Sequence, residues 1–178
     1  TRDYVQSMAA GFDPKGSVLL ATVGALPSCN YANGTAGVGA TLTATANAAL
    51  TQTMVDGGSG YTIVGGERIL VKNQAAPAQN GIYTVTQVGS AGAPWILTRA
   101  TDFNTAASGP GMVSPGAFCF VEQGVNATTQ WIMSTSGTIT MGTTGLVFSQ
   151  FGAGVTYTNG NGLSLGGNTF SVNLTGTN

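Results

Sequence analysis

The chain has 178 residues, with five Lys and Arg, six Asp and Glu, no His and a formal net charge of -1. This length fits one sizeable domain with an appendage, and the charge excludes the basic surface that nucleic-acid binding requires. Charged residues make up 6% of the chain, against about 25% in an average soluble domain. Two stretches, 16–55 and 123–178, contain no charged residue. This pattern favours a surface covered by partner subunits over one kept wet only by Thr, Ser, Asn and Gln.

The amino-acid composition also excludes several kinds of catalytic and metal-binding site. Without His, the chain has no Ser-His-Asp or Cys-His arrangement and no histidine metal site. Its two cysteines, Cys29 and Cys119, define neither a disulfide framework nor a metal cage, and we expect them to be small buried side chains. No apolar run approaches the about 18 residues of a membrane span. We therefore expect no metal, no cofactor and no membrane insertion.

The N-terminal segment 1–11 has the pattern of a short helix. Tyr4, Val5 and Met8 fall at helical spacing in RDYVQSMAAG, and Gly11 is placed to end the helix. A helix of about two turns is marginal alone and requires a partner surface. We predict that these three side chains take part in docking or oligomerisation.

Strands are expected from residue 17 onward. SVLLAT (17–22) predicts a strand, and the Gly- and Ala-rich segment 23–40 predicts a long excursion, either a loop or a contact arm. After TLTATANAALTQT, which alternates around Leu42 and Leu50, further strands are predicted at RILVKN, GIYTVTQV, PWILTRA, GAFCFVEQ, TQWIMST and GLVFSQF. GIYTVTQV and PWILTRA are the expected partners of a hairpin. The fold class predicted is all-β, a compact antiparallel β-sandwich or barrel-like domain.

The segment from Gly152 onward differs from the rest of the chain. Its apolar residues recur with period two between Asn-Gly and Gly-Gly-Asn turns, at Leu163, Leu165, Phe170, Val172 and Leu174. Short strands with so few apolar side chains cannot bury a core alone. We predict that these residues take part in oligomerisation, in a segment intertwined between subunits.

The few charges concentrate around GERILVKNQ and WILTRATD. Six of them are predicted to form structural ion pairs that fix loops: Glu67, Arg68, Lys72, Arg99, Asp102 and Glu122. Two functional alternatives stay open. Trp95, Trp131 and Tyr83 would suit a sugar-stacking platform, and two of the carboxylates would suit a polysaccharide depolymerase if they flanked a groove.

Seven segments, in order, resemble a recurrent domain of bacteriophage tail-fibre (tail fibre/collar-type) proteins: DPKGSV, GERILVKNQ, NGIYTV, WILTRATD, FCFVEQG, QWIMST and TITMGTTGLVFSQF. The resemblance covers about residues 12–151. It implies a virion structural protein of the phage tail, assembled in the host cytoplasm, without enzymatic activity and acting as a homotrimer. It also implies contacts with other phage tail or baseplate proteins, with host-surface glycan bound by other regions.

These observations give three expected parts. Residues 1–11 are a helical docking segment, residues 12–151 a β-rich domain and residues 152–178 the start of an intertwined trimeric fibre shaft. The expected function is trimerisation and attachment or spacing of the fibre for host adsorption. The alternatives are a carbohydrate-binding module and a depolymerase.

Overall fold

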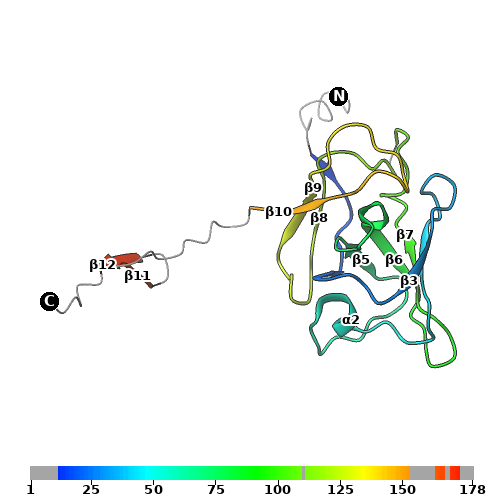
Figure 1. Ribbon diagram of the computed structural model, residues 1–178, viewed down its shortest axis with the longest axis horizontal. Coiled ribbons are helices and arrows are strands. Elements are labelled where there is room, and N and C mark those ends of the chain that lie inside the picture. The colour runs from blue at the N-terminus through cyan, green and yellow to red at the C-terminus, as the bar shows by residue number, and fades with distance from the viewer. Residues whose placement is uncertain (1–11, 110, 153–162, 167–168, 173–178) are drawn as a thin grey trace.

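The computed structural model describes residues 12–109, 111–152, 163–166 and 169–172 (Figure 1). Residues 12–109 and 111–152 form a sandwich-like β domain of two mixed sheets, with four and six strands, and one short helix. The four-stranded sheet has the order β1 (Asp13–Pro14), β8 (Ala117–Phe120), β9 (Gln130–Met133) and β10 (Phe148–Phe151). The six-stranded sheet has the order β2 (Leu20–Ala21), β5 (Arg68–Val71), β6 (Gly81–Gln87), β7 (Ile96–Arg99), β4 (Thr41–Ala44) and β3 (Cys29–Ala32).

The predicted β-sandwich is confirmed at this level, but its strands are not all antiparallel. β1 pairs with β8 in parallel, and β2 pairs with β5 in parallel. The reason is that segment 13–22 joins both sheets. The Val18 N–H donates to the Phe120 carbonyl at 2.9 Å, whereas the next N–H, of Leu19, donates to the Arg68 carbonyl at 2.8 Å. The chain therefore changes sheets between these two residues.

The six-stranded sheet is buried on both faces at β2, at β5 and at the start of β6. Toward the four-stranded sheet, Leu70 and Ile82 belong to a core cluster with Phe103 and Cys119. Toward the opposite side, a second cluster contains Ile69, Val71, Tyr83, Val85, Trp95 and Leu97. Because successive side chains of a strand point to opposite faces, the run Ile69–Leu70–Val71 supplies both clusters.

The helix α2 (Gln52–Asp56) lies beside the second cluster, to which it contributes Val55. Thr51 is its N-cap, and its hydroxyl accepts from the Met54 N–H at 3.4 Å. Gly57 ends the helix with φ 75°, a left-handed conformation that favours glycine. A 3-10 turn, η1 (Pro77–Gln79), precedes β6. Within the described residues, no helix is long and apolar enough to cross a membrane.

In segment 23–56, one sequence prediction is wrong and the helix α2 was not predicted. The excursion 23–40 contains β3, which pairs with β4 as the edge strand of the six-stranded sheet and so belongs to the domain. The alternation near Leu50 ends in α2 and does not continue as a strand. The predicted hairpin is confirmed, because β6 and β7 pair antiparallel with a register irregularity between Val85 and Gln87.

The two ends of the chain are described only in part. The predicted helix of 1–11 lies outside the described residues, as does Leu174. In the C-terminal segment, β11 (Leu163–Gly166) and β12 (Thr169–Val172) form an antiparallel two-stranded sheet. Its register places Leu163 opposite Val172 and Leu165 opposite Phe170.

Candidate functional site

Two of the six predicted ion-pair residues pair with each other. Arg68 Nη2 lies 2.8 Å from Asp102 Oδ2. The same guanidinium donates to the carbonyls of Ser17 and Gly16 at 3.0 and 3.2 Å, and the Gly16 N–H donates to Asp102 at 2.9 Å. Arg68 therefore holds the sheet-changing segment against the loop that follows β7.

The remaining predicted carboxylates contact hydroxyl groups. Glu67 accepts from the Tyr61 hydroxyl and, at 2.9 Å, from the Val64 N–H. The bond to Glu67 raises the pKa of Tyr61. Glu122 accepts from the Ser17 hydroxyl. In the described part of the chain, neither Glu67 nor Glu122 forms an ion pair, contrary to the predicted network.

The partners of Lys72 also differ from the predicted ones. Its Nζ lies 4.0 Å from the centroid of the Trp131 ring and donates to Asn73 Oδ1 at 3.0 Å. Burial lowers the pKa of Lys72. The lysine thus covers a tryptophan face and does not link two loops through a carboxylate.

Arg99 is the most unusual of the charged residues because it is buried without a carboxylate among the described residues. Nη1 donates to the Asn80 carbonyl at 2.9 Å, and Nη2 donates to the hydroxyls of Tyr83 at 2.9 Å and Tyr31 at 3.4 Å. Among the described residues, its Nε has no hydrogen-bond partner. Burial raises the pKa of Tyr83 despite the neighbouring guanidinium. The predicted pairing of Arg99 with a carboxylate is therefore wrong, and its role is to fix the start of β6.

The two tryptophans proposed for sugar stacking lie in different surroundings. Trp95 is 1% exposed and belongs to the second core cluster. Trp131 is half-buried, with Lys72 over its ring and its Nε1 donating to the Thr129 hydroxyl at 3.0 Å. Trp95 is not accessible to a sugar, and Trp131 has its ring contacted by a cation from its own chain.

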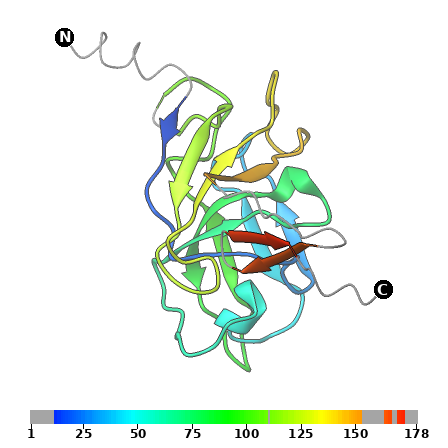
Figure 2. The same cartoon turned by 90° about the vertical axis from the view of Figure 1, so that its left-hand side faces the viewer.

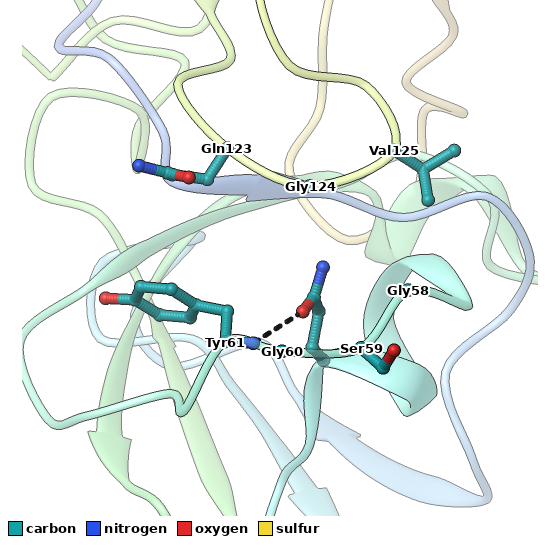
Figure 3. A pocket seen from close by; sticks show the side chains of 8 residues that line it. Gly58, Ser59, Gly60, Tyr61, Gln123, Gly124 and Val125 are labelled. Carbon is teal, nitrogen blue, oxygen red and sulfur yellow. Dashed lines mark hydrogen bonds between the residues drawn. The ribbon is translucent and has the colours of Figure 1, made fainter.

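An open groove of about 440 Å³ lies between the loop after α2 and the turn between β8 and β9, lined by Gln52, Gly58, Ser59, Gly60, Tyr61, Gln123, Gly124 and Val125 (Figure 3). Two polar side chains at the groove, Gln52 in its lining and Asp56 beside it, already have internal partners. Gln52 accepts from the Tyr61 N–H at 2.9 Å. The buried Asp56 carboxylate accepts from the N–H groups of Gly58 and Val125 at 2.8 and 2.9 Å.

The groove is therefore a joint between two loops. The Gln52 oxygen and the adjacent Asp56 carboxylate are already hydrogen-bonded within the chain, so they offer little to a ligand. No group of three or more Cys, Asp or Glu side chains in the described ranges is placed to hold a metal ion.

The outer side of the four-stranded sheet carries an uncovered group of apolar side chains. The register pairs Phe118 with Ile132, and Gln130 with both Phe120 and Phe151, so these residues share one face. We call this surface the aromatic face and define it by Phe12, Pro14, Phe118, Phe120, Ile132 and Phe151. Figure 2 views the molecule from the side of this sheet, from β1 in blue to β10 in orange.

Aromatic contacts tie the face together across the sheet. The Phe12 ring packs edge-on against Phe118 and Phe151, with centroids 5.9 and 5.7 Å apart. Phe12, Phe120 and Phe151 are nevertheless 51%, 39% and 48% exposed. The strand positions that share this face by register include only Gln130 and Ser149 as polar residues, and none is charged.

The charges of Asp13 and Lys15 are turned away from the aromatic face, whereas Glu122, two residues after Phe120, is exposed at its border. In the strand register, Asp13 lies opposite Ala117, whose side chain is on the buried side of the sheet. Lys15 binds Asp13 at 2.9 Å with its side chain 3% exposed, and donates to the Met112 carbonyl at 2.8 Å. The aromatic face therefore contacts solvent without a charged side chain from β1.

The sequence prediction did not select this face, although it placed strands at β8, β9 and β10; the strand β1 was not predicted. The run Ala117–Phe118–Cys119–Phe120 is apolar at every position, which hides which side is outward. The signal was the size of the side chains: Ala and Cys occupy the buried positions, and two phenylalanines occupy the more exposed ones. Two large aromatic residues on the less buried side of a strand indicate a contact surface.

The residues predicted to oligomerise are described only in part. Tyr4, Val5, Met8 and Leu174 lie outside the described residues, whereas Leu163, Leu165, Phe170 and Val172 occupy paired positions in β11 and β12. Comparisons with protein-family models, curated proteins and solved structures find no match for this chain.

Proposed function

We propose that this chain is a structural module of a bacteriophage tail fibre that acts by assembling into a homotrimer. The observation that carries the proposal is the β11–β12 hairpin, a sheet of only two strands in the described part of the chain. An isolated two-stranded hairpin is marginal in water at best. Copies of the segment, wound or stacked together, would supply the buried surface that one copy lacks.

The charge distribution supports the same function. Residues 123–178 contain no charged side chain, so copies of this region do not repel one another. Seven segments resemble phage tail-fibre proteins in their order along the chain. This resemblance supports a location in the virion tail, where the fibre would be attached to or spaced from other tail or baseplate proteins. In this proposal the chain has no catalytic role and needs no cofactor.

Light scattering coupled to size-exclusion chromatography tests the assembly. The full chain is expected at three times its 17.8 kDa mass, and deletion of 152–178 is expected to shift the population toward monomer on dilution. A full chain that stays monomeric at every concentration overturns the homotrimer. Gold-labelled antibody against the chain, applied to phage particles that carry it, is expected to mark the tail; labelling confined to the head contradicts the tail-fibre assignment.

A further inference from the structure

The aromatic face is a group of exposed apolar side chains on the described surface that the domain's own packing does not explain. Phe12, Phe120 and Phe151 expose between 39% and 51% of their surface. Exposed apolar groups of this kind mark interaction sites on soluble proteins. The tail-fibre proposal, which rests on the C-terminal hairpin, leaves this face without a role.

We propose that the aromatic face is the surface through which the β domains of neighbouring copies pack around the threefold axis of the trimer. This inference rests on the proposed homotrimer and names the surface of the domain that forms it. The occupant of the face is thus another copy of this chain.

Charge favours an identical copy as the partner. No strand position on the face carries a charge, Lys15 is paired with Asp13 on the other side of β1, and the exposed Glu122 lies only at the border of the face. An uncharged aromatic surface can meet its own symmetry mate without bringing like charges together. A strongly charged partner would find no opposite charge there.

The path of the chain provides the second argument. Phe151 lies on the face, is the last residue of β10 and is followed directly by the segment that leads to the hairpin. If three aromatic faces meet at an axis, the three chains leave their domains close to that axis, where their tails can associate. Packing of residues 1–11 onto the face of their own chain would block this arrangement.

The test introduces one charge into the face of the full chain. Phe120→Glu and Phe151→Glu place a carboxylate among aromatic side chains, so we expect the association constant of the trimer to fall by about 100-fold or more, since burying an unpaired charge is costly. Val64→Glu is the matched control, because Val64 is 51% exposed on a loop outside the face. Phe120→Leu keeps the apolar character and is expected to stay trimeric. Sedimentation over a dilution series measures all four variants.

Folding is checked separately by the near-ultraviolet circular dichroism of buried Trp95, which each variant should retain. The inference is supported if the wild-type chain is a trimer and the Phe120→Glu and Phe151→Glu variants have a lower trimer association constant. If both glutamate variants fold and assemble like Val64→Glu, the face is not the interface, although the homotrimer stands. A monomeric wild type overturns the homotrimer itself. If deletion of residues 1–11 is what exposes the face to a hydrophobic dye in an intact trimer, the occupant is the chain's own N-terminal segment and the inference fails.

Discussion

At the scale of single residues, Gly81 and Arg99 are coupled. Gly81 opens β6 with φ 148°, and a Cβ built there would lie 2.1 Å from Arg99 Nη1. The space above Gly81 is thus filled by the guanidinium, which donates to the Asn80 carbonyl. The Asn-Gly pair looks like an ordinary turn signal in the sequence, but here its glycine makes room for a buried cation.

Gly81→Ala is therefore expected to lower the free energy of unfolding by about 2–4 kcal/mol, through backbone strain and displacement of the Arg99 head group. Urea denaturation followed by circular dichroism measures the change. Gly24→Ala is the control, because nothing lies within 4 Å of a Cβ built at Gly24, and it should change stability by less than about 1 kcal/mol. Equal effects of the two substitutions would contradict the coupling.

The burial of the Cys119 thiol predicts that the protein loses stability in alkaline solution. Burial raises the pKa of this thiol from 9.0 to about 12. A folded pKa above the unfolded one means that stability is complete below pH 9 and falls as the pH rises toward 12, because only the unfolded thiol ionises in that window. From pH 8 to 9.5 the expected loss is on the order of 1 kcal/mol.

The measurement compares the urea midpoints of Cys29→Ala and the double variant Cys29→Ala/Cys119→Ala at both pH values. Removing Cys29 from both proteins matters because burial also raises the pKa of Cys29. The single variant should lose more stability than the double variant. Parallel loss in the two proteins would show that Cys119 does not titrate as its burial requires.

At the scale of elements, the Asn80 side chain fixes the connection between β5 and β6. Its Oδ1 accepts from the Gln74 N–H at 2.9 Å, and its Nδ2 donates to the carbonyls of Lys72 and Leu146 at 3.2 and 2.9 Å. Leu146 belongs to the cluster between the sheets. One amide thus closes the loop and ties it to the segment that enters β10.

Asn80→Ala should cost about 2–4 kcal/mol of unfolding free energy, since it leaves buried backbone groups without partners. Asn30→Ala is the comparison, because Asn30 is exposed on the edge strand β3, and should stay within about 0.5 kcal/mol of wild type. Denaturant midpoints and slopes for both variants decide the matter. A small effect at Asn80 would mean that water replaces its bonds.

The strands were predictable where local pattern and burial agree. β7 alternates between half-buried and buried positions, and its hairpin with β6 follows from the sequence. β3 was missed because CNYA lies in a segment rich in turn residues, where pairing with β4 outweighs the weak local preference. The parallel pairings depend on contacts between residues far apart in sequence, such as Pro14 with Phe118, which no local pattern reveals.

The candidate surfaces also depend on contacts between residues far apart in sequence, which local patterns do not reveal. Charge scarcity correctly drew attention to Arg68 and Asp102, yet the sequence offered several partners for each cation and only packing selects among them. Arg99 was expected at a carboxylate and instead binds a carbonyl and two hydroxyls. The aromatic face is assembled from β1, β8, β9 and β10, so it becomes visible only once those strands are paired.

At the scale of the whole molecule, the proposed assembly should depend little on salt. Raising NaCl from about 0.1 M to 1 M shortens the screening length from about 10 to 3 Å, which weakens contacts between charges. The aromatic face and residues 123–178 have no charges to screen. Sedimentation should therefore give trimer association constants within about 3-fold of each other at the two salt concentrations, whereas sulfate should strengthen association because it favours burial of apolar surface. A fall of tens-fold in NaCl would instead place charged residues such as Glu67 or Glu122 in the interface.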